Sequence, residues 1–177
     1  IKRGWLQITR KSPIDEQESA VCTFLGIGSI GARAELSISF RSAEHRGPDW
    51  TAKVAWAKRV EHLAAPQVAM LPKYSKAALE KSIPKLLKLA AAEDGVTQVP
   101  ASLAKLGIGF LVLPHLPKTF LDGAILLVNG HPVVALSLRY DRIDNFWFTL
   151  LHELAHCLRG DYVFIEQNGE DEDEADA

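Results

Sequence analysis

Residues 124–138 read AILLVNGHPVVALSL, and this stretch decides the fold. Two apolar runs flank the dipeptide Asn129-Gly130, and both of these residues tolerate the positive φ angles of a tight turn. The pattern therefore predicts a β-hairpin with strands at about Ala124–Val128 and Val133–Leu138. Pro132 has no backbone N–H to give to a neighbouring strand, so we expect it at the turn or at an edge.

A third apolar run, Ile108–Leu113, precedes the hairpin and predicts another strand. Upstream of it, apolar residues recur at helical spacing, and the sequence predicts several helices bounded by proline and glycine. The expected helices are Trp50 to about Ala64 (capped by Asp49 and stopped by Pro66), Lys76–Lys81, Ser82 to about Glu93 (ended by Gly95), Pro100–Gly107, and Asn145–Arg159 (capped by Asp144 and ended by Gly160). Helices, three strands and a closing helix indicate an α+β fold, with a helical N-terminal part and a small three-stranded sheet.

Composition narrows the class of protein. The 177 residues are 47% hydrophobic and 24% charged, which is typical of a globular chain that needs no disulfide framework. Only two cysteines and no apolar run of about 18 residues predict a cytoplasmic protein without a membrane span. The first 140 residues hold no dense Lys/Arg cluster, which argues against a nucleic-acid-binding surface here. Because the chain opens on Ile1-Lys2-Arg3, we expect a fragment of a longer protein.

The last predicted helix carries the motif His152-Glu153-Leu154-Ala155-His156, an H-E-x-x-H pattern. Residues four apart on a helix lie about 40° apart around its axis, so both imidazoles can reach one metal ion. Glu153 projects about 100° from His152, where it can take a proton from a water on that metal. Asn145, Thr149, His156 and Arg159 fall within about 60° of His152, while the large apolar residues cluster on the opposite side.

A catalytic zinc site needs a third protein ligand, and the acidic end of the chain offers one. Glu172 and Asp176 share a helical face, so Glu172 could bind the metal while Asp176 accepts a hydrogen bond from a metal-bound histidine. Glu174 is the alternative ligand. The competing interpretation is a solvated acidic tail, since residues 141–177 hold 11 acidic and 2 basic side chains.

The quoted residues also resemble a known family. Phe148–His156, FTLLHELAH, followed by EDEADA at residues 172–177, is similar to zinc metallopeptidases of the ImmA/IrrE family. By that resemblance His152, His156 and Glu172 match the family's metal ligands, and Glu153 matches its catalytic glutamate. Residues 112–119, 121–124 and 135–147 look like the branch in which this zincin-like domain follows a helix-turn-helix head, as in HigA-like antitoxins.

The resemblance implies a helical connector over residues 1–70 and a C-terminally truncated metallopeptidase-like domain over residues 71–177. It implies Zn²⁺, or another divalent metal, as cofactor, and a repressor or toxin as protein partner. DNA contact would come only through a helix-turn-helix domain that this sequence does not contain. Two functions stay open: an endopeptidase that cleaves its partner, or a catalytically silent regulatory module. The oligomeric state is open too, with a homodimer as one alternative.

Five other signals have simpler interpretations. Cys157 points toward the apolar side of the last helix and is expected to pack in the core rather than bind metal. His115, Tyr140 and Tyr162 could stabilise an oxyanion, but a loop histidine and structural tyrosines are the default. Residues 26–31 fit G-x-G-x-x-G, and we expect a glycine-rich turn there rather than a nucleotide site.

Overall fold

The computed structural model describes residues 3–30, 36–38, 50–117, 119, 121–162 and 165–167. The chain divides into two compact units, one made of residues 1–45 with 164–177 and the other of residues 46–163. Each unit is described by itself. The functional division at residue 70 that the family resemblance implies stays a prediction.

The described residues of the first unit form one helix and a two-stranded sheet. Helix α1 spans Ile14–Leu25 and ends at Gly26, whose φ of 72° is left-handed. Gly26 is therefore a helix cap, the position in which glycine is strongly preferred. Strand β1, Leu36–Ile38, pairs antiparallel with β5, Ile165–Gln167. The rings of Trp5 and Phe24 stack with their centroids 6.1 Å apart.

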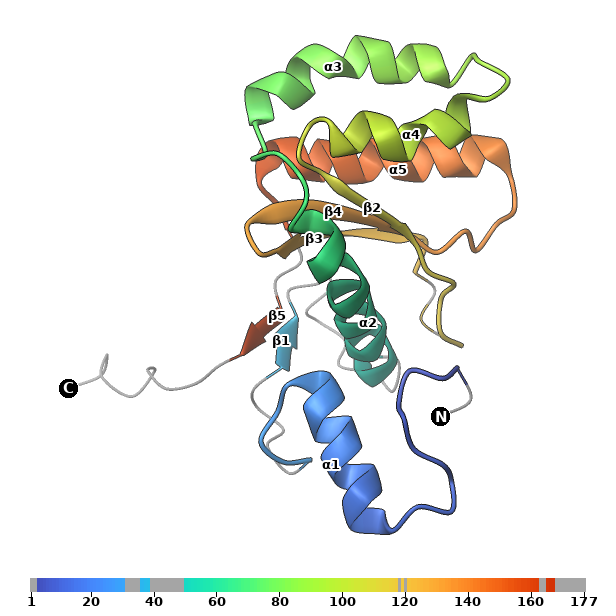
Figure 1. Cartoon of the computed structure of the whole chain (residues 1–177). Helices are drawn as coiled ribbons and strands as arrows, with labels where there is room; N and C mark the ends of the chain where they lie inside the picture. Colours follow the sequence, from blue (N-terminus) through green and yellow to red (C-terminus); the bar gives the residue numbers. More distant parts are fainter. Residues whose placement is uncertain are drawn as a thin grey trace, which may run out of the picture. The chain divides into compact units, whose positions relative to one another are not determined.

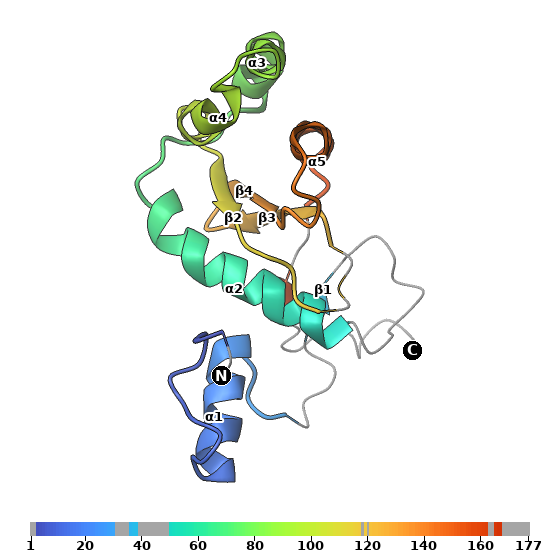
Figure 2. The same ribbon diagram turned by 90° about the vertical axis from the view of Figure 1, so that its right-hand side faces the viewer.

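The second unit is an α+β domain, which confirms the predicted fold class. Its helices are α2 (Trp50–Val68), α3 (Lys76–Leu89), α4 (Gly95–Ala104) and α5 (Ile143–Arg159), and its strands are β2 (Gly109–Val112), β3 (Gly123–Val128) and β4 (His131–Leu136). The strand order is β2-β4-β3, with β4 parallel to β2 and antiparallel to β3. Helix α2 covers one face of the sheet, α4 and α5 cover the other, and α3 packs on α4 and α5 (Figures 1 and 2).

The predicted hairpin is present between β3 and β4. Asn129 and Gly130 have φ angles of 50° and 80°, as a tight turn of this kind requires. Pro132 lies on the central strand but pairs with Leu127 beside the turn, and the pairing of β4 with β2 begins only at Val133. Its missing N–H therefore costs the sheet no hydrogen bond.

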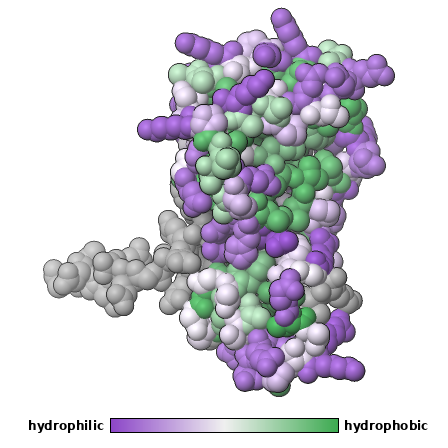
Figure 3. Space-filling view, in the orientation of Figure 1, coloured by the Kyte–Doolittle hydropathy of each residue, from purple (hydrophilic) through white to green (hydrophobic). Residues whose placement is uncertain are grey.

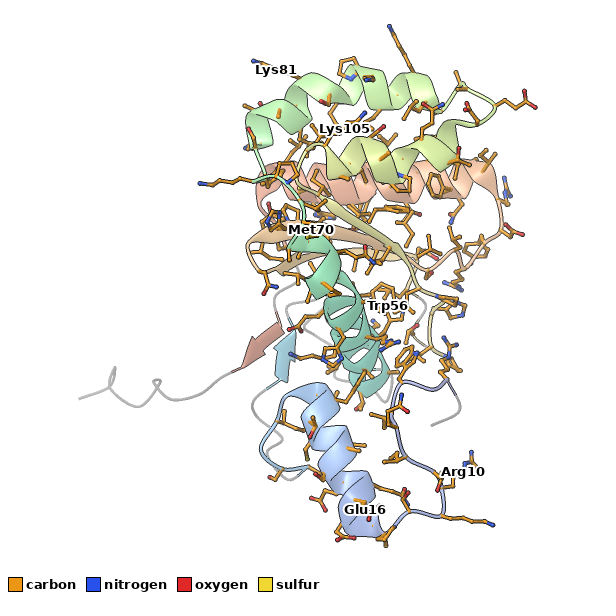
Figure 4. The ribbon with its side chains drawn as sticks, viewed as in Figure 1. Arg10, Glu16, Trp56, Met70, Lys81 and Lys105 are labelled. Carbon is orange, nitrogen blue, oxygen red and sulfur yellow. The ribbon has the colours of Figure 1, made fainter. Side chains whose placement is uncertain are left out.

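Both faces of the sheet are packed with apolar side chains. On the α2 side, Trp56 is fully buried and donates from Nε1 to the backbone oxygen of Leu113 at 3.0 Å (Figure 4). On the other side, the core joins α3, α4, α5 and the sheet through Leu79, Leu86, Val99, Leu103, Ile125, Val134, Leu150 and Leu154. Helix α5 is thereby fixed along its length against the sheet.

Two proline predictions are wrong. Pro66 does not stop α2, which continues to Val68, and Pro84 does not begin a new helix, because α3 is continuous from Lys76 to Leu89. Pro84 and Glu80 are exposed, so the carbonyl that loses its i+4 partner can be hydrated instead. Figure 3 shows hydrophilic side chains over this outer side of α3, and Lys81 projects from it in Figure 4.

Three predicted helix boundaries are also wrong. Gly95 begins α4 rather than ending the preceding helix, and Pro100 lies inside α4. A Cβ on Gly95 would lie 1.8 Å from the backbone oxygen of Leu89, so only glycine fits this approach of α4 to the end of α3. Helix α5 begins at Ile143, and Asp144 pairs with Arg142 instead of capping the helix. The predicted cap Asp49 lies outside the described residues.

Among the residues that the structure describes, no helix is long and apolar enough to cross a membrane.

Candidate metal centre

The two histidines of the motif meet on the exposed side of α5. The Nε2 atoms of His152 and His156 lie 3.0 Å apart, and their rings meet edge to face with centroids separated by 4.6 Å. His152 is exposed, whereas the side chain of His156 is 16% exposed. The helical spacing thus brings both Nε2 atoms to one point, as predicted.

Glu153 sits on the buried side of the same turn. Only 7% of this residue is exposed, and burial alone raises the pKa of its carboxyl group to about 7. The structure gives its carboxylate no ion pair with any described residue. A glutamate with a pKa near neutrality can both accept and return a proton at physiological pH.

The end of α5 folds back onto His156. Gly160 has a left-handed φ of 76°, and the N–H of Asp161 donates to the carbonyl of His156 at 3.0 Å, which is a Schellman motif. The carboxylate of Asp161 comes to the same residue: its Oδ2 lies 3.6 Å from Nδ1 of His156. Arg159 completes the cluster, with Nε 2.9 Å from Oδ2 of Asp161 and Nη2 2.9 Å from Nδ1 of His156.

The sequence analysis does not anticipate the Asp161 contact; the carboxylate that it predicts beside the histidines, Asp176, lies outside the described residues. The sequence nevertheless contains a signal for this contact, because Gly160 is predicted to end the helix. In a Schellman turn, the N–H of the residue after that glycine donates to the carbonyl of the residue five positions before it, which here is His156.

A close contact with the sheet fixes the middle of α5. A Cβ on Gly123 would lie 2.7 Å from the methyl carbon of Thr149, so the absence of a side chain at Gly123 lets Thr149 enter. Thr149 is 6% exposed, although its helical angle predicted a place on the histidine face. Residue 149 therefore anchors the helix to β3 one turn before His152.

Phe148 extends the exposed surface next to the histidines. It is 73% exposed, and its ring stacks on that of His152 with centroids 6.2 Å apart. An open hollow begins there and continues toward the start of α5. Its lining residues are Tyr140, Arg142, Asp144, Asn145 and Phe148.

The third predicted ligand cannot be placed. Glu172, Glu174 and Asp176 all lie outside the described residues. Within the part of the chain that is described, no group of three or more His, Cys, Asp or Glu side chains is arranged to hold a metal ion. Of the predicted site, the structure therefore describes the imidazole pair and its neighbours.

Of the remaining candidates, Cys157 and Tyr162 pack within the domain and Tyr140 lies on its surface. Cys157 is 1% exposed, which confirms core packing, and its Sγ lies 3.4 Å from the hydroxyl of Tyr74. The Tyr162 hydroxyl donates to the backbone oxygen of Cys157, and burial raises its pKa to about 12. Tyr140 is 48% exposed beside Arg139, whose guanidinium lies 4.9 Å from the ring centroid.

Comparison of the chain with protein-family models, curated proteins and solved structures gave no match.

Proposed function

We propose that this chain is a zinc-dependent endopeptidase domain of the ImmA/IrrE type, which cleaves a partner regulatory protein with Glu153 as general base. One observation carries the proposal: the Nε2 atoms of His152 and His156 converge to 3.0 Å on the exposed side of α5. The proposed setting is a cytoplasmic regulator, with a repressor or toxin as the partner.

The spacing of the two nitrogens fits a zinc ion. With Zn–N distances of about 2.0–2.1 Å and tetrahedral angles, two histidine ligands would place their nitrogens about 3.3 Å apart. The pair at 3.0 Å needs an adjustment of only a few tenths of an ångström. A hydrogen bond between the rings also accounts for this distance before a metal binds, so metal analysis is needed to test the site.

The proposed role of each residue follows from the position of its side chain. His152 and His156 would hold the ion, with Glu172 or Glu174 as the proposed third ligand. When bound, zinc would polarise the scissile carbonyl and lower the pKa of a water ligand. Glu153 would take a proton from that water and pass it to the leaving amine, and its raised pKa suits both steps.

A second candidate function is a regulatory module that binds metal or a protein partner but does not cleave. The burial of Glu153 favours it, since a general base must reach the water that it deprotonates. In this case the histidine pair would act as a binding or sensing site only.

Two substitutions separate these functions. Zinc content is measured on the purified chain, and cleavage is followed by mass spectrometry of new termini in the regulatory protein encoded beside its gene. Under the endopeptidase proposal, His152→Ala loses both zinc and cleavage, whereas Glu153→Gln keeps zinc and loses cleavage. Cleavage at the wild-type rate by Glu153→Gln would refute the catalytic assignment. If the wild-type chain holds no zinc after exposure to Zn²⁺, the histidine pair is not a zinc site, and neither function can depend on zinc.

A further inference from the structure

Two contacts of His156 bear on which ring nitrogen holds its proton. Arginine can only donate, so the contact from Nη2 of Arg159 makes Nδ1 of His156 an acceptor. The ring proton of neutral His156 then resides on Nε2, from which it can donate to Nε2 of His152 at 3.0 Å. In this arrangement the Nε2 lone pair of His156 is not available to a metal ion.

Metal binding through Nε2 needs the other tautomer. The proton must move to Nδ1, and Nδ1–H then needs an acceptor. Asp161 supplies one, because its Oδ2 lies 3.6 Å from Nδ1 and closes to a normal hydrogen bond by moving about 0.7 Å. Its backbone is already fixed to His156 by the Schellman turn at Gly160.

We propose that Asp161 is a positioning residue, which accepts a hydrogen bond from Nδ1–H of His156 and so presents Nε2 to a divalent cation. Arg159 competes for the same atom, because its Nη2 lies 2.9 Å from Nδ1 and as a donor favours the opposite tautomer. The two side chains are coupled, because the guanidinium that contacts Nδ1 also pairs with Oδ2 of Asp161 at 2.9 Å. Binding of a divalent cation would thus replace Arg159 by Asp161 as the hydrogen-bond partner of Nδ1.

This inference rests on the proposed metal site and makes a quantitative prediction for zinc affinity. Loss of such an outer-sphere carboxylate typically weakens metal binding by about 10–100-fold. We therefore expect Asp161→Asn to weaken Zn²⁺ binding by at least about tenfold, and Asp161→Glu to recover part of the loss. Arg159→Gln removes the competing hydrogen bond and should tighten binding by about threefold or more.

The opposite end of α5 offers a matched control. Arg142 and Asp144 form the same Arg-x-Asp pair, with Nε of Arg142 donating to Oδ1 of Asp144 at 3.0 Å. Asp144→Asn and Arg142→Gln change charge as Asp161→Asn and Arg159→Gln do, but they lie more than two helical turns away from His152. Both control variants should bind Zn²⁺ within about twofold of the wild-type chain.

Affinity is measured on the 177-residue chain by competition for Zn²⁺ with a chromophoric chelator, alongside thermal unfolding of each metal-free variant. Asp161→Asn with wild-type affinity, or Asp144→Asn with an equal loss, overturns the positioning role. If Arg159→Gln does not bind Zn²⁺ more tightly than the wild-type chain, the proposed competition of Arg159 for Nδ1 of His156 is overturned. If the wild-type chain binds no Zn²⁺, the proposed function itself fails, so the two failures are distinguishable.

A second readout does not depend on affinity. In ¹⁵N-histidine-labelled protein, the nitrogen shifts of His156 should report protonated Nε2 without metal and protonated Nδ1 with Zn²⁺ bound. In Asp161→Asn the Nδ1 proton of the loaded protein should exchange faster with solvent. Protonated Nδ1 already present in the metal-free wild-type chain would overturn the tautomer exchange, which a merely structural role for Asp161 does not produce.

Discussion

Replacing Glu153 by glutamine should stabilise the metal-free protein at alkaline pH. Burial raises the pKa of this carboxyl group from 4.5 to about 7, so ionisation is easier in the unfolded chain than in the folded one. The resulting loss of stability is absent below the pKa of Glu153 in the unfolded chain. It grows between pH 4.5 and 7 and reaches its full size above pH 7. Glutamine keeps nearly the same shape and does not ionise.

The expected magnitude follows from the size of the pKa shift. A difference of one pKa unit between the folded and unfolded chain corresponds to about 1.4 kcal/mol. Glu153→Gln should therefore raise the free energy of unfolding by about 3 kcal/mol at pH 8 and by less than about 1 kcal/mol at pH 5. The measurement is urea unfolding with a metal chelator present, followed by tryptophan fluorescence. Glu80→Gln, on the exposed side of α3, is the matched control and should show no such pH dependence.

Two results would refute the reasoning. Equal unfolding free energies of wild-type protein and Glu153→Gln at pH 8 would mean that the carboxylate is not desolvated. A larger gain at pH 5 than at pH 8 would mean that the folded state favours the ionised form, as it would beside a bound cation.

Three further predictions concern single contacts. His152→Ala should lose bound zinc in metal analysis yet keep the thermal midpoint of the metal-free wild-type protein, because His152 is exposed; retained equimolar zinc would contradict the site. Gly123→Ala should lower the free energy of unfolding by about 1–3 kcal/mol, because the new Cβ lies 2.7 Å from the methyl carbon of Thr149. Adding Thr149→Ser to this variant should restore the free energy of unfolding. A Gly123→Ala variant as stable as the wild-type protein would argue against the close contact. Trp56→Phe deprives the Leu113 carbonyl of its donor and should cost about 1–2 kcal/mol in urea unfolding; an unchanged midpoint would disprove that hydrogen bond's contribution.

The features that sequence predicted well are those set by local chemistry. The turn at Asn129-Gly130 and the end of α5 at Gly160 depend on positive φ angles, which few residues tolerate. The convergence of His152 and His156 follows from helical geometry alone. Each of these features is encoded within five residues or fewer, so no knowledge of distant contacts is needed to predict it.

The features that sequence missed are those set by packing. Pro84 lies inside α3 because burial of Leu79 and Leu86 outweighs one lost hydrogen bond. Gly95 begins a helix because the backbone of Leu89 lies too close for a side chain. Thr149 is buried because Gly123, distant in sequence, leaves room for it. None of these packing interactions is visible in the local pattern.

The Schellman turn at Gly160 has a consequence for the order of assembly. His152, Glu153, His156 and Asp161 occupy ten consecutive residues, so one helical segment and its terminating turn bring them together. Helices form within about a microsecond, whereas pairing β2 with β4 must close a loop of some twenty residues. The imidazole pair can therefore exist on a nascent helix before the sheet beneath it is complete, and a captured ion would then favour the helical state during folding.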